Sequence, residues 1–300
     1  MQSLRTPDDR FADLPDYPYA PNYVDIDDLE GGTLRVHYLD EGPTDGPVVL
    51  AMHGEPSWSY LYRKIIPLLT AAGLRVIAPD LVGFGKSDKP SEKSDYTCAR
   101  HVAWMQEAII DHLDLHDTTF FGQDWGGLVG LRLVANNPDR FARVVIGNTG
   151  LPTGEGAPSD AFMAWQKFSQ ESPVFPIGQI LQGATDTALT DGEVAAYDAP
   201  FPDETFKEGA RIFPSLVPTS TDDPAAPDNR EAWKVFMQWD KPFICCFSDR
   251  DPITRGGDAP FLRRVPGTKG QPHTTLRGGH FIQEDDPEGF AQLIIRSRAG

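Results

Sequence analysis

Apolar runs that alternate with amphipathic segments dominate residues 47–149 of this chain. PVVLAMH at 47–53 is apolar up to its last residue, which is typical of a strand buried on both faces. Further apolar runs follow, separated by segments with helical spacing: runs 75–80, 118–124 and 143–149, and helical segments 59–73, 101–115 and 127–138. This alternation predicts the α/β class, with a mostly parallel central sheet and helices on both of its faces.

The alternation stops after residue 151, and residues 152–230 are rich in Pro, Asp, Ala and Phe with only short helical stretches. Regular segments then return: strands 242–248 and 274–278 and a last helix at 287–298. We predict a core domain made of residues 1–151 and 231–300, with residues 152–230 inserted as a helical cap where such sheets bind ligands. A second domain with its own function is the alternative. Residues 1–32 are expected to wrap the surface.

Composition narrows the possible partners. Lys and Arg number 27 against 44 Asp and Glu, so the formal net charge is −17, which disfavours binding to nucleic acid or to an anionic membrane. The three cysteines are Cys98 and the adjacent Cys245 and Cys246; neighbours on a strand point to opposite faces, so no disulfide is expected, and no zinc-type spacing exists. No apolar run reaches signal-peptide or membrane-helix length, which favours a cytoplasmic location.

The segment Gly122-Gln123-Asp124-Trp125-Gly126-Gly127 joins an apolar strand to a helical segment. This is the setting of a nucleophile elbow, a strained turn that lifts one side chain above the sheet and is flanked by glycines because a Cβ would clash there. Asp124 holds the central position, where Ser is usual. We therefore predict Asp124 as a nucleophile, and the alternative is an N-cap of the following helix.

A carboxylate in place of serine changes the chemistry that this turn can perform. Serine attacking an alkyl carbon would form an ether, which water does not readily cleave. A carboxylate attacking the same carbon forms an ester, which an activated water molecule can hydrolyse. An aspartate nucleophile therefore indicates displacement at saturated carbon, either loss of halide or opening of an epoxide.

Two later segments supply partners for this nucleophile. His280, in Gly278-Gly279-His280-Phe281, follows the last predicted strand and can take a proton from water. Asp251, in the loop after PFICCF, can orient the imidazole and stabilise its cation, and Asp249 is its main rival. The order nucleophile, acid, histidine is the one found with a nucleophile elbow. Either aspartate could instead be a solvated turn residue.

The segment His53-Gly54-Glu55-Pro56 follows the apolar strand 47–53. The backbone N–H of Glu55 and that of Trp125, next after the nucleophile, occupy the positions expected for two oxyanion-hole donors. These donors would stabilise the tetrahedral intermediate of ester hydrolysis. We expect His53 to shape this loop.

Together these segments resemble the haloalkane dehalogenase family, which has the α/β-hydrolase fold. The resemblance covers about residues 33–290 and includes four motifs in order: HGEPSW (53–58), DLVGFGKSDKP (80–90), GQDWGG (122–127) and GGHFIQEDDP (278–287). It implies an Asp–His–Asp triad beneath a helical cap. It also implies conversion of a haloalkane and water to an alcohol, halide and a proton without a cofactor or metal, so the expected partners are a small apolar halogenated substrate and the halide ion.

The same resemblance assigns the halide-binding residues. In this family the residue after the nucleophile, here Trp125, gives its indole N–H to the departing halide, and an indole N–H can donate but not accept. One branch takes a second donor from an Asn at the position of Glu55, which cannot donate when ionised. The other branch uses a cap Trp and an acid placed like Asp251, and Trp165 is the single Trp in residues 152–230. Packing of the cap is the alternative role for Trp165.

Aromatic side chains of the cap are expected to line a small apolar cavity: Phe162, Phe168 and Phe206. We expect a monomer, with a homo-oligomer left open.

Two other functions stay open. An epoxide hydrolase shares the HGxP segment and the Asp nucleophile, but it normally needs two cap tyrosines, and residues 152–230 hold one, Tyr197. A non-catalytic binding protein of this fold would normally lack a member of the triad. A haloacid hydrolase fits less well, because it would need an Arg near the nucleophile, where Trp125 stands.

Overall fold

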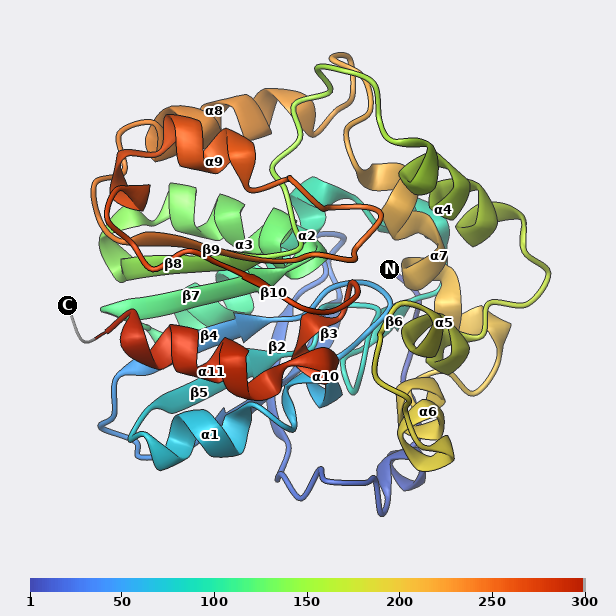
Figure 1. Cartoon of the computed structure of the whole chain (residues 1–300). Coiled ribbons are helices and arrows are strands. Elements are labelled where there is room, and N and C mark those ends of the chain that lie inside the picture. The colour runs from blue at the N-terminus through green and yellow to red at the C-terminus, as the bar shows by residue number, and fades with distance from the viewer. Residues whose placement is uncertain (299–300) are drawn as a thin grey trace.

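The computed structural model describes residues 1–298 and contains an eight-stranded sheet with the order β10-β9-β8-β7-β4-β5-β3-β2 (Figure 1). In chain order these strands are β2 (Asn22–Asp27), β3 (Thr33–Glu41), β4 (Val48–Met52), β5 (Arg75–Pro79), β7 (Thr118–Gln123), β8 (Phe141–Gly147), β9 (Phe243–Ser248) and β10 (Thr274–Leu276). Six neighbouring strands of the sheet, β10, β9, β8, β7, β4 and β5, pair in parallel. By contrast, β3 pairs antiparallel with both β5 and β2. The mostly parallel sheet predicted from the sequence is confirmed.

Residues 22–27 form the edge strand β2, and the prediction that residues 1–32 only wrap the surface is wrong at this point. β2 pairs with β3 from Asn22 opposite Tyr38 to Asp27 opposite Thr33. Val24 and Ile26 are buried while the aspartates beside them are exposed, which is the alternation of a strand with one solvated face. The pattern spans only six residues and contains two aspartates. The sequence therefore does not distinguish this strand from a loop.

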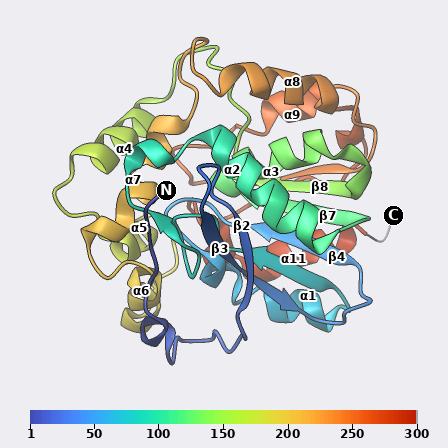
Figure 2. The same cartoon turned by 180° about the vertical axis from the view of Figure 1, so that it is seen from behind.

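Helices cover both faces of the sheet, as Figures 1 and 2 show from opposite sides. On one face lie α2 (Cys98–Met105), α3 (Trp125–Asn136), α8 (Ala226–Phe236) and α9 (Ala259–Arg264); on the other lie α1 (Ile66–Ala71) and α11 (Pro287–Arg296). Every residue of β7 is consequently buried, which explains the continuous apolar runs of the sequence. None of the helices within residues 1–298 combines the length and apolar character needed to cross a lipid bilayer.

Two predicted helices differ from the observed ones. The segment 59–73 divides into a 3₁₀ helix, Ser59–Tyr62, and the short α1, because Pro67 has no N–H to continue an earlier helix. The helix predicted at 101–115 begins earlier, at Cys98, where the Thr97 hydroxyl caps it by accepting from the Arg100 N–H, and it continues as a π-helical turn, Gln106–Asp111.

Four helices between β8 and β9 group beside one end of the sheet in Figure 1: α4 (Asp160–Glu171), α5 (Ile177–Gly183), α6 (Asp191–Asp198) and α7 (Glu208–Ile212). Their buried side chains, including Leu181 and Tyr197, belong to the same hydrophobic cluster as the sheet. The predicted boundary at residue 230 falls inside α8, which is tied to α3 by a hydrogen bond of 3.2 Å from Arg132 to Asn229.

Candidate active site

Asp124 lies on the sharp turn between β7 and α3, with φ 51° and ψ −125°. A positive φ is uncommon for a residue with a Cβ and costs on the order of 1–3 kcal/mol, so the surroundings must hold it. The Asp124 N–H donates to the Asn148 carbonyl at 3.0 Å, and the Asp124 carbonyl accepts from the Thr149 hydroxyl at 2.7 Å. The neighbouring strand end therefore fixes the turn and directs the carboxylate away from the sheet.

Two glycines let neighbouring backbone approach this turn. A Cβ on Gly126 would lie 2.0 Å from the carbonyl oxygen of Met52, at the end of β4. A Cβ on Gly122 would lie 2.5 Å from the Phe120 ring and 2.8 Å from the Gly127 Cα. A larger residue at Gly126 would push α3 away from β4, and one at Gly122 would push α3 away from β7, so either would displace the turn.

The Asp124 carboxylate contacts the loop predicted to supply an oxyanion hole. The Glu55 N–H donates to Asp124 Oδ1 at 2.7 Å. Trp125 is the first residue of α3, where amide N–H groups have no partner within the helix and the helix dipole favours negative charge. The structure thus places one of the two predicted donors, the Glu55 N–H, at the Asp124 carboxylate, and the Trp125 amide stays a prediction based on its place at the start of α3.

His280 lies between two carboxylates. Its Nε2 is 3.4 Å from Asp124 Oδ2, and its Nδ1 is 2.8 Å from Asp251 Oδ2. Asp251 is completely buried and also accepts hydrogen bonds from the Ile253 N–H, at 2.9 Å, and from the Thr254 hydroxyl. With Nδ1 donating to Asp251, Nε2 faces the nucleophilic position, which is the orientation that a proton acceptor there requires.

Burial and charge act in opposite directions on this pair. Burial raises the pKa of Asp251, but the charge of His280 and hydrogen bonds from His280, Thr254 and Ile253 outweigh it and lower the pKa to about 2. Burial lowers the pKa of His280, but the charge of Asp251 and hydrogen bonds with Asp124 and Asp251 raise the pKa well above its usual value. Asp251 is therefore ionised near neutral pH, and the two carboxylates favour the protonated imidazole.

The structure separates the two aspartates that the sequence left open. Asp251 contacts the imidazole, whereas Asp249 is exposed and accepts from the Gly278 N–H at 3.1 Å. Asp249 therefore supports the backbone of the loop that carries His280, and Asp251 is the residue brought to the imidazole itself.

Asn148 and Ser248 hold the His280 loop, and neither was predicted as a site residue. The Asn148 side-chain amide donates to the carbonyls of His280, at 2.8 Å, and Gly279, at 3.1 Å. The Ser248 hydroxyl donates to the Gly279 carbonyl at 2.6 Å, and the Ser248 N–H donates to Asn148 Oδ1 at 2.9 Å. Both residues stand at the carboxyl ends of central strands, where such sheets bind ligands. Polar residues at these strand ends in the sequence could therefore have been predicted as part of the site.

A small cavity of about 80 Å³ lies against Asp124 and His280. Apolar and aromatic side chains from the core and from the α4–α7 region form most of its wall: Trp125, Leu128, Phe162, Trp165, Ile180 and Pro214. The structure thus brings both tryptophans predicted to bind halide, one from α3 and one from α4, to the same cavity as the nucleophilic carboxylate.

A wider cleft of about 640 Å³ also reaches Asp124. Its walls are formed by the segment 149–159 on one side and by residues 217–219 and 253–257 on the others. Several of these residues are exposed, so the cleft connects the carboxylate to the surface.

Aromatic packing fixes the two indoles. Trp125 is buried, with its ring centroid 4.5 Å from that of Phe213. Trp165 is half-buried, and its centroid lies 5.9 Å from Phe168 and 5.6 Å from Phe175. Among residues 1–298 the Trp125 indole N–H donates to no protein acceptor, so it is available to a ligand.

One of the three phenylalanines predicted to line the cavity does so, and the prediction for the other two is wrong. Phe162 lines it. Phe168 is 41% exposed and packs on Trp165, because six positions along α4 place it on a different face from Phe162. Phe206 is half-buried and packs against the hydrophobic core.

The Glu55 side chain is buried beside this cavity. It is 4% exposed, and its Oε1 has no hydrogen-bond partner among the described residues. Burial and the charge of Asp124 raise the pKa of Glu55 well above its usual value, while the charge of His280 and the nearby Trp165 indole oppose the shift. The protonated carboxyl is therefore favoured, and unlike the ionised form it carries an O–H that can donate.

His53 supports the loop that carries Glu55. Its Nε2 accepts from the Leu81 N–H at 3.0 Å and its Nδ1 donates to the Gly54 carbonyl at 2.9 Å. Burial lowers the pKa of His53 and favours its neutral form. Within residues 1–298 no three His, Cys, Asp or Glu side chains gather in an arrangement that would hold a metal ion.

The chain is similar to known proteins along almost its whole length. Residues 47–287 match the family model described as alpha/beta hydrolase fold. A haloalkane dehalogenase of Psychrobacter cryohalolentis is 60% identical over 99% of this chain and 98% of that protein, and one of Mycolicibacterium paratuberculosis is 50% identical over 98% of each. The solved structure of a tetrameric haloalkane dehalogenase from Paraglaciecola agarilytica has a TM-score of 0.89 and 36% identity, over 100% of this chain and 99% of that one.

We predict that Gly126→Ala lowers the free energy of unfolding by about 1–3 kcal/mol, because the new Cβ would overlap the Met52 carbonyl at 2.0 Å. Urea unfolding followed by circular dichroism measures the change. Gly183→Ala is the matched control, since nothing lies within 4 Å of its Cβ position and a helical alanine is favourable. Equal stability of the two variants would contradict the close contact between α3 and β4.

Proposed function

The chain belongs to the haloalkane dehalogenase family of α/β-hydrolases and hydrolyses the carbon–halogen bond of haloalkanes, and we propose that it does so through an ester formed on Asp124. The reaction converts a haloalkane and water into an alcohol, a halide ion and a proton. One observation carries the proposal: the side chain at the elbow is a carboxylate that borders an apolar cavity and lies 3.4 Å from the His280 imidazole.

In the first step, a carboxylate oxygen of Asp124 attacks the carbon that bears the halogen. The new carbon–oxygen bond forms as the carbon–halogen bond breaks, and the halide leaves with the bonding electrons. The indole N–H groups of Trp125 and Trp165, which border the same cavity, stabilise the negative charge that develops on the halogen. The apolar lining keeps water away and so strengthens these electrostatic interactions.

In the second step, His280 Nε2 takes a proton from a water molecule that attacks the carbonyl carbon of the ester. The N–H groups of Glu55 and Trp125 stabilise the oxyanion, and the Glu55 N–H already donates to Asp124 Oδ1 at 2.7 Å. Asp251 stabilises the imidazolium. The intermediate then expels the alcohol, which takes the proton from the imidazolium, and the Asp124 carboxyl ionises and releases the second proton of the water molecule.

Formation of the ester makes the neutral, proton-accepting form of His280 available. In the free enzyme, hydrogen bonding with Asp124 and its charge are among the causes that raise the pKa of His280. The ester is neutral, so these two contributions disappear while that of Asp251 stays, and the pKa of His280 falls on alkylation. A lower pKa favours the neutral imidazole, which is the form that accepts a proton from water.

The main alternative, an epoxide hydrolase, needs cap tyrosines that protonate the epoxide oxygen. The Tyr197 hydroxyl donates to the buried Glu284 carboxylate, and Tyr197 is not among the residues that line the cavity. We therefore favour dehalogenation. Purified protein that releases halide from 1,2-dibromoethane and leaves styrene oxide intact fits this function, and the reverse selectivity would reject it. A binding protein would process neither compound.

We also propose that residues 152–230 act as the cap of this site, since Phe162, Trp165 and Ile180 come from α4 and α5. Both steps use only side chains and water, so the mechanism requires no cofactor. We propose a monomer in the cytoplasm. The three cysteines are free and buried, which fits a reducing compartment. Sedimentation analysis decides between a monomer and the tetramer described for the Paraglaciecola agarilytica relative.

We predict that His280→Phe still forms the alkyl ester on Asp124 but hydrolyses it about 10²–10⁴ times more slowly, because the water molecule loses its base. Intact mass spectrometry after incubation with 1,2-dibromoethane should show one added bromoethyl group. Asp124→Ala is the control and should show none. Absence of the adduct from folded His280→Phe, while the wild type releases halide, would exclude the covalent mechanism.

We predict that Trp165→Ala slows cleavage of the carbon–halogen bond about 100-fold, since one of two donors to the leaving halide is lost. Phe206→Ala removes a cap aromatic that does not line the cavity and should stay within about threefold of the wild type. Stopped-flow fluorescence and rapid-quench halide release measure the step. Equal effects of the two substitutions would remove Trp165 from the halide site.

We predict that Glu55→Gln keeps halide release near neutral pH within about threefold of the wild type, because burial raises the pKa of the native carboxyl and so favours its neutral form. Glu55→Ala, which opens a polar void, should be slower than Glu55→Gln. A large loss of activity in Glu55→Gln would mean that the reaction needs the ionised carboxylate.

A further inference from the structure

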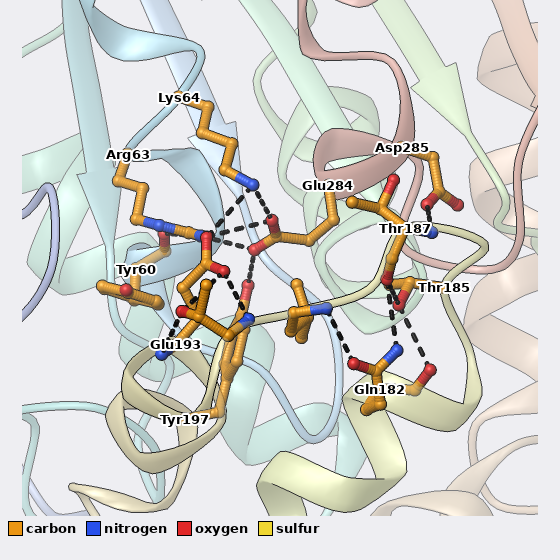
Figure 3. Close-up of polar contacts among 12 residues, drawn as sticks. Tyr60, Arg63, Lys64, Gln182, Thr185, Thr187, Glu193, Tyr197, Glu284 and Asp285 are labelled. Atoms are coloured by element: carbon orange, nitrogen blue, oxygen red, sulfur yellow. Dashed lines mark hydrogen bonds and ion pairs between the residues drawn. The ribbon is translucent and has the colours of Figure 1, made fainter.

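The short helix α10 (Ile282–Asp285) directly follows His280 and ends in two acidic residues, Glu284 and Asp285. Figure 3 shows that both carboxylates point toward residues of the α5–α6 region. Neither acid belongs to the triad, and neither lines the cavity. Their contacts join the loop that carries the imidazole to the helices that cover it.

Asp285 joins two separate loops through three backbone amides. Its Oδ2 accepts from the Gly279 N–H at 2.7 Å, immediately before His280. The same carboxylate accepts from two amides in the loop between α5 and α6: the Asp186 N–H at 3.2 Å and the Thr187 N–H at 2.8 Å, the latter drawn in Figure 3. Hydrogen bonds to a charged acceptor are stronger than those between neutral groups.

A backbone contact joins the same two loops a second time. The His280 N–H donates to the Ala184 carbonyl at 2.7 Å. A Cβ on Gly279 would lie 2.3 Å from that carbonyl oxygen, so the loops can approach this closely only with glycine at 279. The main chain of the triad histidine is thus in direct contact with the end of α5.

The loop after α5 is held in one conformation by its own hydrogen bonds, so a shift of this loop would also shift the His280 loop that it contacts. The Gln182 side chain donates to the Thr187 carbonyl at 3.1 Å and accepts from the Leu189 N–H at 2.7 Å (Figure 3). The Thr185 hydroxyl lies within hydrogen-bonding distance of the same Thr187 carbonyl, at 3.1 Å. These contacts connect residues 184–189 to α5, which supplies Ile180 to the cavity wall.

Glu284 anchors α10 to the core and to α6. Its buried carboxylate accepts from Arg63 and from Lys64, the latter at 2.8 Å, and from the Tyr197 hydroxyl of α6. Glu193 of α6 pairs with the same Arg63 (Figure 3). A buried ion network of this kind holds its members rigidly, because loss of one partner leaves a buried charge uncompensated.

We propose that Asp285 is a positioning residue of the hydrolytic step, whose carboxylate ties residues 186–187 to the backbone beside His280 and so sets the distance between the imidazole and the ester on Asp124. The proposal rests on the function proposed above, because it concerns the second of the two steps. A displacement of about 1 Å at a reacting group can cost about 100-fold in rate. Alkylation of Asp124 does not use the imidazole, so a shifted His280 loop slows hydrolysis selectively.

The test separates the two steps in Asp285→Ala and Asp285→Asn, with 1,2-dibromoethane and rapid quench. Asp285→Ala is expected to lower the rate of ester hydrolysis about 10–100-fold while alkylation stays within about threefold of the wild type. The alkylated enzyme should then accumulate at steady state, visible as an added bromoethyl group by intact mass spectrometry. Asp285→Asn keeps one acceptor oxygen and should give an intermediate effect. If the alanine variant folds poorly, this more conservative variant still tests the role of Asp285.

Asp286→Ala is the matched control, since Asp286 accepts from the Gly289 N–H at 2.9 Å and caps α11. It should lower the melting temperature without changing the ratio of the two rates. Equal slowing of both steps in the Asp285 variants, or no slowing of either, would overturn the role of Asp285. If the wild type itself releases no halide or never forms an ester, the proposed function fails instead, so the two failures are distinguishable.

Discussion

The imidazole of His280 lies in a buried position between two carboxylates. The chemistry of the site depends on how these carboxylates differ in accessibility and in whether they keep their charge. Asp251 is inaccessible and held by further donors, and its pKa is lowered to about 2, so it is ionised at neutral pH. Asp124 stands on a strained turn and, in the mechanism proposed above, loses its charge when it is alkylated. The reaction itself therefore changes the proton affinity of His280, and the base becomes available in the step that requires it.

This arrangement requires backbone groups to meet at the carboxyl ends of parallel strands. β4, β7, β9 and β10 each end next to a residue of the site, and these strands are adjacent or nearly so in the sheet. The loops carry the reacting side chains, but the positions of the loops are set by buried polar groups such as Asn148. A site assembled this way keeps its geometry because each loop is anchored to a rigid strand end.

The helices above the sheet contribute chemistry as well as cover. They bring Trp165 to the same apolar cavity as Trp125 and Asp124, and electrostatic interactions in such a cavity are stronger than in water. The same low polarity raises the pKa of the Glu55 carboxyl and so favours its protonated form, which can donate a hydrogen bond. Hydrogen bonds to Asp285 of α10 connect these helices to the His280 loop, so the same contacts hold both the wall of the cavity and the imidazole in place.

The sequence alone predicted the sheet, the elbow at Asp124 and a histidine near it, because each depends on local spacing or on a compact motif. The resemblance to a known family, and not local spacing, pointed to the two tryptophans that line the cavity. The sequence favoured Asp251 but left Asp249 as a rival, since both lie in one turn and only the direction of a side chain distinguishes them. It also missed the edge strand β2, the surface position of Phe168 and the supporting role of Asn148, which depend on neighbours distant in the chain. Tertiary structure decided these points because burial, side-chain direction and proton affinity are properties of the surroundings that folding brings together.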